Sequence, residues 1–463
     1  MAVAMADVWE QLPLAEAFWL LWKEALPDDA LDEFYDEHRG RCYQRCFAFS
    51  DLVHLVNDAL CQHQGRALAT LSRHADSERC PASAEAFYGK LRRVPTELSD
   101  SLVSWAAQRL RPWRSAVTSS DRLASCFSAL RVLVFDGKTL KGASKRLKPL
   151  RRLPGAAIGG RVLGVLDLAT GLVVGMSSHP HGHVNEQVMV SDALAQVRER
   201  VQGPRLWVAD RQFGNLANFK RCTQSGDHCL LRKHIRSVFQ ADPEQPVRIG
   251  VDAEGRSWTD EVGTLRSSRE GEQVARQITL RRGQDGDLVL LTSLTDRQAY
   301  PASEVLELYR QRWDIEEMYQ KVSEVFQLSH LIGSHPQAMI FQSALCLTLA
   351  NVLTVLRSLL ARSQRRAVET VSVANVWYDL QRQLTSSYVL ASPDAISAAI
   401  VDRAGLVVDL RAHLQRVLAA GWTDRWIKAP PKKRHLPKVK HRRGGKAHFS
   451  THAVLQEHAQ RER

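Results

Sequence analysis

The sequence predicts an α/β protein in which a mixed β-sheet lies between two helical regions. Three observations predict this fold class. Apolar residues recur at spacings of three and four through residues 1–125, which is the helical period. Short runs rich in β-branched residues begin at Arg131 and alternate with helical patterns, as in an α/β sheet. Mostly helical sequence returns at about Ser303 and continues to about Ile427.

The charge balance favours a polyanionic partner such as nucleic acid. The 463 residues include 63 Lys and Arg against 50 Asp and Glu, a formal net charge of +13. The N-terminus has no basic segment before an apolar run, so a secretory signal is not expected and a cytoplasmic protein is predicted. The longest uncharged stretch, residues 339–356, contains five polar residues and is predicted to be a core helix rather than a membrane span.

The N-terminal region, residues 1–125, is expected to be an all-α domain. Its clearest helical periods cover residues 12–26 and 86–110. Five arginines on or beside these helices, interleaved with two tryptophans, suit a surface that contacts DNA phosphates. Solvated helix faces with tryptophans in the core explain the same pattern equally well. These residues are Arg92, Arg93, Arg109, Arg111, Arg114, Trp105 and Trp113.

The second region, residues 126–360, carries the strands. Two of them are joined by a polar loop with Gly171, which predicts a hairpin. With helices at 185–200 and 215–223, the element order becomes β-β-β-α-β-α-β, which is the ribonuclease H-like arrangement of a mixed sheet. The predicted strands are residues 131–135, 161–166, 172–177, 205–209 and 228–233.

Residues 235–293 interrupt this order with Gly-rich turns and further strands, so they are predicted to be a β insertion. A single helix is expected over residues 303–328, opened by Pro301 and by acids that complement a helix N-terminus. A helical C-terminal region, 361–427, precedes a basic tail, 428–463. Residues 428–446 hold nine Lys or Arg and no acid, and are expected to be flexible until they meet phosphate.

Two acids follow predicted strands. Asp136 ends the run VLVF, and we expect Gly137 to let the chain turn there; Asp210 ends the run LWVA. Either residue alone is also explained as a cap for the next turn. Two acids side by side at strand ends are costly unless a cation lies between them, and hard oxygen ligands suit Mg²⁺ or Mn²⁺.

A third acid lies on the predicted long helix. At 100° per residue, Glu316 lies about 20° and Arg312 about 60° from Tyr309, so the three side chains share one face. A core helix does not tolerate this combination without a reason, because buried charge is costly. A buried Arg–Glu ion pair is the competing explanation.

These residues resemble the DDE transposases of bacterial insertion sequences, in the insertion sequence four type, whose ribonuclease H-like core contains a β insertion. The resemblance covers roughly residues 131–360. Its most specific segments are 135–142 (FDGKTLKG), 208–214 (VADRQFG), 290–296 (LLTSLTD) and 309–317 (YRQRWDIEE). It implies that Asp136, Asp210 and Glu316 are catalytic, bind two Mg²⁺ or Mn²⁺ ions, and support DNA cleavage and strand transfer.

The resemblance also implies the partners. The DNA partner is double-stranded and includes both the terminal inverted repeats and the target. A second copy of the chain is expected on the paired ends, and no membrane is expected. The expected location is the bacterial cytoplasm, at the nucleoid when the protein is bound to DNA. Trp313 is expected either to stack on an unpaired base or to belong to the core. The residues expected to contact DNA are Tyr309, Arg312, Trp313, Lys138, Arg211, Lys432, Lys433 and Arg434.

One position departs from the family signature, which places Lys seven residues after the Glu. Here that position is Ser323, and Lys321 lies about 120° round the helix from Tyr309. Two alternatives to an active transposase therefore stay open. One is a ribonuclease H-like nuclease without strand transfer, and the other is a DNA-binding relative that has lost catalysis.

Overall fold

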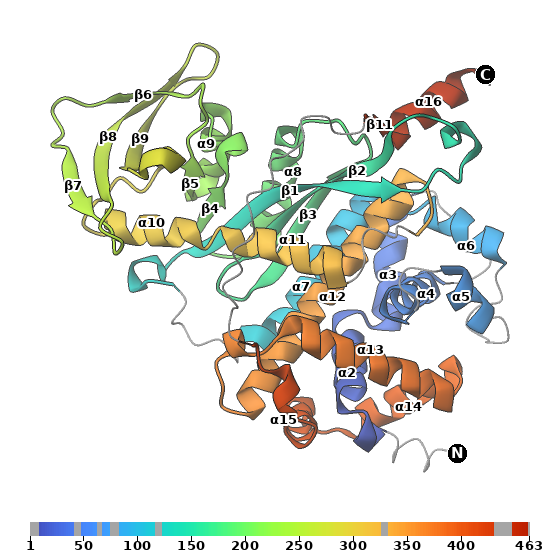
Figure 1. The fold of residues 1–463 in the computed structure, drawn as a ribbon. Helices are drawn as coiled ribbons and strands as arrows, with labels where there is room; N and C mark the ends of the chain where they lie inside the picture. Colours follow the sequence, from blue (N-terminus) through green and yellow to red (C-terminus); the bar gives the residue numbers. More distant parts are fainter. Residues whose placement is uncertain are drawn as a thin grey trace.

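The protein is described by a computed structural model over residues 9–40, 48–62, 67–74, 83–115, 123–325, 332–429 and 447–461. A long sheet lies across a body of helices (Figure 1). The predicted helical character of the N-terminal region is confirmed over its described residues. Its helices are α2 (Pro13–Ala25), α3 (Asp28–His38), α4 (Phe49–Gln62), α5 (Ala67–Arg73), α6 (Ala84–Leu91) and α7 (Thr96–Ser115).

The sheet has eleven strands in the order β11-β2-β1-β4-β5-β10-β9-β8-β6, with β3 paired to β2 and β7 to β8. Strands β1, β2 and β3 are antiparallel neighbours, whereas β4 and β5 run parallel to β1. This mixed sheet is consistent with the predicted ribonuclease H-like core. The core elements are β1 (Arg131–Ala143), β2 (Ala156–Asp167), β3 (Leu172–His179), α8 (Gln187–Arg200), β4 (Arg205–Ala209), α9 (Leu216–Cys222) and β5 (His228–Arg232).

Strand β1 is longer than predicted. The sequence placed its end at residue 135 with a turn at Gly137, but the strand continues to Ala143. Pairing with β2 keeps it extended, since Asp136 lies opposite Gly164 and Gly137 opposite Leu163. Asp136 is therefore in the middle of a strand, and the turn prediction was wrong.

The predicted β insertion forms strands that continue the core sheet. β10 is antiparallel both to β5 and to β9. The fully buried Arg276 pairs with Asp260 at 2.8 Å and donates to two carbonyl oxygens in the segment before α10, which holds the insertion to the core. The strands are β6 (Val238–Ala241), β7 (Arg248–Val251), β8 (Ser257–Ser267), β9 (Gly271–Leu280) and β10 (Leu288–Thr292).

The single helix predicted over residues 303–328 is two helices, α10 (Ala302–Arg310) and α11 (Trp313–Val325). Between them, the N–H groups of Gln311 and Arg312 each donate to the carbonyl oxygen three residues earlier, at 3.0 and 3.1 Å. This tighter hydrogen bonding ends the regular α-helical rotation. The angles calculated for one straight helix therefore do not apply across Arg312.

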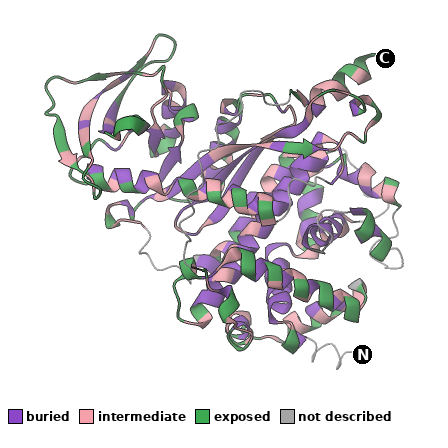
Figure 2. Ribbon diagram, in the orientation of Figure 1, coloured by how far each residue is buried: buried purple, intermediate pink, exposed green. Residues whose placement is uncertain are grey.

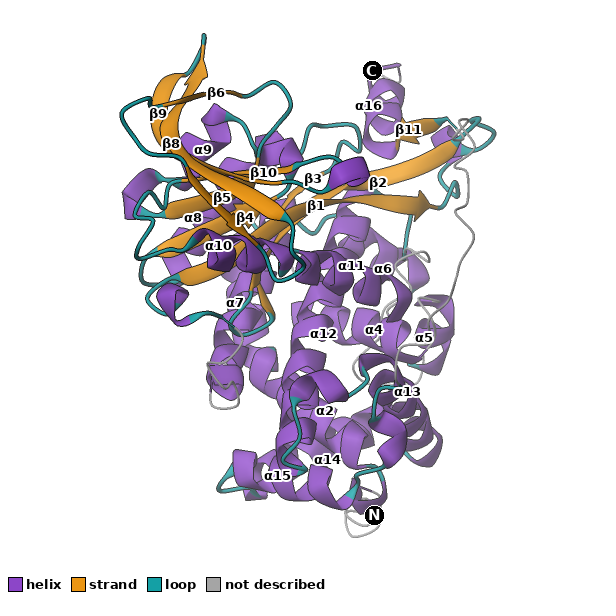
Figure 3. Ribbon diagram, turned by 60° about the vertical axis from the view of Figure 1, so that its left-hand side comes forward, coloured by secondary structure: helices purple, strands orange, loops and turns teal. Residues whose placement is uncertain are grey.

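Helix α12 (Pro336–Ser363) runs through the middle of the molecule (Figure 3). Figure 2 shows it among the most buried elements, together with the central strands. By length and composition it could cross a membrane, but 89% of its most apolar segment is buried inside the fold. Its buried Asn351 donates to the carbonyl oxygen of Val173 and accepts from the same residue's N–H, as expected for a core helix beside β3.

The N-terminal and C-terminal helices form one body around α12. Gln383 accepts from the backbone N–H groups of Leu14 and Ala15, and the buried Glu16 pairs with Arg403 at 2.9 Å and His413 at 2.8 Å. The C-terminal helices are α13 (Val373–Leu390), α14 (Pro393–Leu406) and α15 (Leu410–Ala420).

The end of the chain is folded, which the sequence did not predict. β11 (His448–Ser450) pairs in parallel with the edge of β2, and α16 (Thr451–Arg461) follows it. Lys432, Lys433 and Arg434, predicted to contact DNA, lie outside the described residues.

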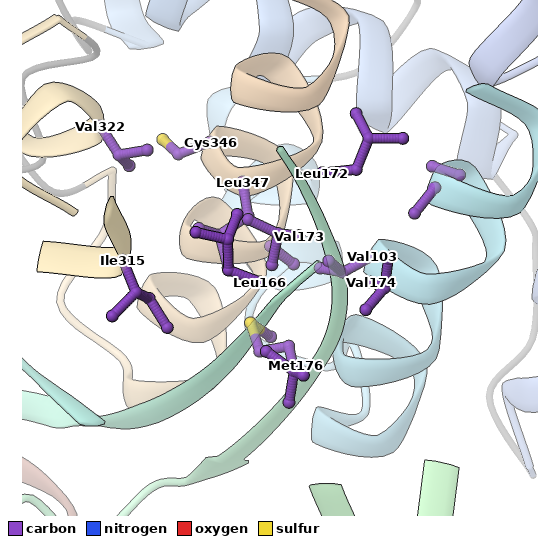
Figure 4. Packing of buried hydrophobic residues seen from close by; sticks show 14 of the residues in the cluster. Val103, Leu166, Leu172, Val173, Val174, Met176, Ile315, Val322, Cys346 and Leu347 are labelled. Carbon is purple, nitrogen blue, oxygen red and sulfur yellow. The ribbon is translucent and has the colours of Figure 1, made fainter. Parts of the chain in front are cut away.

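Apolar packing fixes α11 against the sheet. Figure 4 shows Ile315 and Val322 of α11 facing Cys346 and Leu347 of α12, with Leu166 of β2 beside them. All five side chains are nearly fully buried. Because α11 carries Glu316 next to Ile315, this packing sets the position of that carboxylate.

Candidate active site

Asp136 lies half-buried on β1, at the level of the end of β4. Its Oδ1 accepts a hydrogen bond from the N–H of Gly137 at 2.9 Å. Burial raises the pKa of Asp136 to about 6; the Gly137 hydrogen bond and Arg312 lower it, whereas the negative charges of Glu186 and Glu316 raise it. Asp136 therefore interacts electrostatically with Glu186, Arg312 and Glu316, which all come from outside β1.

Asp210 follows the last residue of β4, as predicted. Parallel pairing of β1 with β4 matches Val134 to Val208, so Asp136 and Asp210 lie two residues beyond the same pair on adjacent strands. The Oδ1 atom of Asp210 is 3.7 Å from Arg232 and 3.5 Å from the hydroxyl of Tyr309. The strand register thus brings the two acids to the same level of adjacent strands, where β4 ends and β1 continues.

Arg312 lies between the acids at the turn that separates α10 from α11. Its side chain is buried, pairs with Glu316 at 2.7 Å, and lies 5.7 Å from the ring centre of Tyr309. Its charge also acts on Asp136 and Asp210. The structure therefore brings Tyr309, Arg312 and Glu316 together, and the Arg–Glu ion pair anticipated from the sequence is present. The Nε atom of Arg312 is buried without a hydrogen-bond partner in the described chain.

Tyr319, on α11, is a site residue that sequence reasoning missed. Its hydroxyl donates to the carbonyl oxygen of Asp136 at 3.1 Å and accepts from the N–H of Gly164 at 2.7 Å. A Cβ atom at Gly164 would lie 2.6 Å from this hydroxyl, so glycine is required there. Burial raises the pKa of Tyr319, which keeps the hydroxyl protonated as a donor. Tyr319 thus fixes the backbone that carries Asp136.

Glu186, just before α8, is a second missed residue. It lies in a His-rich segment that the sequence predicted only as a polar turn. Its carboxylate pairs with Arg161 of β2 at 2.7 Å, and a Cβ atom at Gly137 would lie 2.3 Å from its Cδ atom. Gly137 is therefore needed for the approach of Glu186 rather than for a turn. The segment alone gave no signal, because the partners of Glu186 lie 25 and 49 residues away in sequence.

The acids fit a hard divalent cation in their chemistry. Asp136, Asp210, Glu316 and Glu186 offer only carboxylate oxygens, which Mg²⁺ and Mn²⁺ prefer. Within the described residues, however, no group of three or more His, Cys, Asp or Glu side chains is placed to hold a metal ion. Arg312 supplies the compensating positive charge in this arrangement.

The other predicted DNA contacts surround the acids. Lys138 lies two residues beyond Asp136 with its ammonium group 5.8 Å from the Tyr319 ring centre, and Arg211 is exposed beside Asp210. Trp313 is 59% exposed, so the core role that was one of its two expected roles is wrong, and its role in stacking stays a prediction. Ser323, where the family signature has Lys, donates its hydroxyl to the carbonyl oxygen of Tyr319 at 2.7 Å.

Comparisons with known proteins agree with part of this interpretation. Residues 128–352 match the family model described as Transposase DDE domain, which supports a DDE transposase. No curated protein matches the chain. Among solved structures, the chain is similar to piggyBac transposase in its synaptic complex with hairpin DNA, determined by cryo-EM. The identity is 12%, the alignment covers 90% of this chain and 87% of that chain, and the TM-score is 0.40, which is too distant to assign a function.

Proposed function

We propose that the protein is a transposase of a bacterial insertion sequence, of the insertion sequence four type, that binds transposon-end DNA and catalyses cut-and-paste transposition. The observation that carries this proposal is that Asp136, Asp210 and Glu316 all lie around Arg312, at the level where β4 ends. The match of residues 128–352 to a transposase DDE domain supports the same activity.

In this proposal the acids would hold the cations and the neighbouring side chains would hold the DNA. Two Mg²⁺ or Mn²⁺ ions bound by Asp136, Asp210 and Glu316 would stabilise the attacking and leaving oxygens of a phosphodiester. Arg312 has an unpartnered Nε atom in the described structure and can donate to a phosphate oxygen next to the acids. Trp313 is exposed beside it, so its ring is available to stack on an unpaired base.

The remaining parts of the proposal concern the setting of the reaction. The DNA partners are the terminal inverted repeats and a target duplex, and two copies of the chain act on paired ends in the bacterial cytoplasm. The net charge of +13 favours accumulation on DNA.

The test is cleavage of a labelled DNA fragment that contains the sequence flanking the gene. We predict that Asp136→Ala, Asp210→Ala and Glu316→Ala each abolish cleavage and joining, while DNA binding stays within a few-fold, because metal ligation and phosphate contact are separate functions. Chelation of divalent cations should have the same effect on the unsubstituted protein.

The matched control is Glu317→Ala, which removes the exposed acid next to Glu316 on α11 and should leave cleavage nearly unchanged. Full cleavage by any one of the three acid variants would remove that acid from the proposal. Cleavage without joining would identify a nuclease. Binding without cleavage by the unsubstituted protein would identify an inactive relative. This alternative is specific because Ser323 stands where the family signature has Lys.

A further inference from the structure

A strongly basic segment joins β1 to β2. Residues 138–166 contain eight Lys or Arg and no Asp or Glu. Four of these cations, Arg146, Lys148, Arg151 and Arg152, are exposed, and within the described chain none of the four forms an ion pair with a carboxylate. Unpaired exposed cations at this density repel one another unless an anion lies between them.

The fold holds this segment in a defined position. Leu150 is fully buried and Arg151 donates to the carbonyl oxygen of Arg146 at 3.0 Å. Lys145 donates to the carbonyl oxygen of Leu153, and its ammonium group lies 5.3 Å from the ring centre of Phe449 in β11. Because these contacts already hold the loop in one position, binding an anion would cost little further conformational entropy of the backbone.

A groove of about 630 Å³ lies between this segment, α6 and the start of α12. Arg146 and Leu147 line one side, and the exposed Arg92 and Arg93 at the end of α6 line the other. His335 lies at the start of α12, and its Nδ1 atom is buried without a partner among the described residues. We call this cavity the basic groove; three arginines line it against one acid, Glu85, so it has the charge and the donors to bind phosphate.

The length of the chain limits the distance between the basic groove and the acids. Arg146 follows Asp136 by ten residues, which span at most about 33 Å of extended chain. One turn of B-form DNA is about 34 Å. In Figure 1, β1 runs from beside α11 toward the side of α6 and α16, away from the strands of the β insertion, and the antiparallel β2 returns along it. A duplex lying along β1 would therefore bring its backbone to the groove within about one turn of the acids.

We propose that the basic groove binds the phosphate backbone of duplex DNA within about one helical turn of the bond that is cut. This inference rests on the proposed function, since it assumes that the substrate is DNA. The groove contributes position rather than sequence recognition, because phosphate contacts are the same for every base pair.

The test compares Arg92→Ala/Arg146→Ala, which removes two cations that line the groove, with Arg366→Ala/Arg382→Ala, which removes two exposed cations from the C-terminal helical body. Binding of a fluorescein-labelled duplex of about 40 base pairs is titrated at several salt concentrations. The groove variant should lower the logarithmic salt slope by about 1.8 and weaken binding roughly tenfold at low salt, because two phosphate contacts are lost. The control variant should behave like the unsubstituted protein, and melting temperatures check that both variants fold.

A second measurement locates the contact. Methylphosphonate linkages are placed in turn at successive positions within about one helical turn of the cleaved bond of the terminal fragment. At the contacted position they should weaken binding by the unsubstituted protein and have little further effect on the groove variant. An unchanged salt slope in the groove variant would overturn this inference and leave the proposed function intact. Failure of the unsubstituted protein to bind any duplex would overturn both.

Discussion

At the scale of single residues, the sequence indicated the three acids but not the residues that support them. Asp136 and Asp210 follow apolar runs, and Glu316 has the spacing from Arg312 that an ion pair requires, so local pattern is sufficient. Glu186 and Tyr319 have no such pattern, because their partners come from distant segments. Gly137 was noticed but misinterpreted, since only the structure shows which side chain packs over it.

Glu186 provides a test at this scale. Glu186→Gln keeps the size of the side chain but removes one negative charge near Asp136, so we expect weaker binding of divalent cations. Cleavage at low Mg²⁺ should fall about tenfold and recover as the Mg²⁺ concentration is raised, while DNA binding changes less than about twofold. The assay is the cleavage rate as a function of Mg²⁺ concentration.

Glu199→Gln, which removes an exposed acid from the same helix α8, is the matched control and should show the unsubstituted dependence on Mg²⁺. If Glu186 only holds Arg161 in place, Glu186→Gln will lower the melting temperature without changing the dependence on Mg²⁺. That result would exclude a role at the acids.

At the scale of elements, the spacing at which apolar residues recur predicted which segments are helices and strands, but not where each of them ends. The alternation of apolar and polar residues could not show that β1 continues past Asp136, because the extension depends on pairing with β2, whose residues lie 14 to 26 positions further along the chain. A helical wheel could not show the break at Arg312, since the apolar period continues on both sides of it. β11 was missed because three residues are too few for a recognisable pattern.

Asp100 of α7 provides a test of how two elements pack. It accepts a hydrogen bond from the N–H of Ser178 in β3 at 2.9 Å, and burial raises its pKa from 3.8 to about 8. Between these values the folded protein holds a proton that the unfolded chain has lost, so this group makes stability fall as pH rises from about 4 to about 8. Asp100→Asn stays neutral and should be more stable at pH 8 by roughly 1 to 3 kcal/mol, with little change at about pH 4.

The measurement is chemical unfolding of Asp100→Asn and the unsubstituted protein at both pH values. Asp402→Asn, which replaces an exposed acid on α14, is the control and should show no such difference. An equal free-energy difference at both pH values would mean that Asp100 is not buried as a neutral acid.

At the scale of the whole molecule, the regions separated by sequence are not separate bodies. Helices before and after the sheet pack together around α12, and contacts such as Gln383 with Leu14 join residues more than 360 positions apart. Local patterns carry no information about such contacts, which is why the sequence predicted two helical regions and the structure has one helical body. The end of the chain likewise returns to the sheet edge beside the basic groove.

This return changes how the basic tail should be tested. Removing everything from residue 428 onward would also remove β11 and leave the edge of β2 at residues 156–158 without its partner, so reduced DNA binding could follow from a damaged fold. Substitution of Lys432, Lys433 and Arg434 by Ser avoids this problem because it leaves residues 447–461 in place. If all three cations contact phosphate, the logarithmic salt slope should fall by about 2.7, and the melting temperature should not change.

Deletion of residues 447–463 should do the reverse, lowering the melting temperature while all nine cations of residues 428–446 remain. Salt titrations and thermal unfolding of both variants separate the two effects, and an unchanged slope in the triple substitution would show that these residues do not bind DNA.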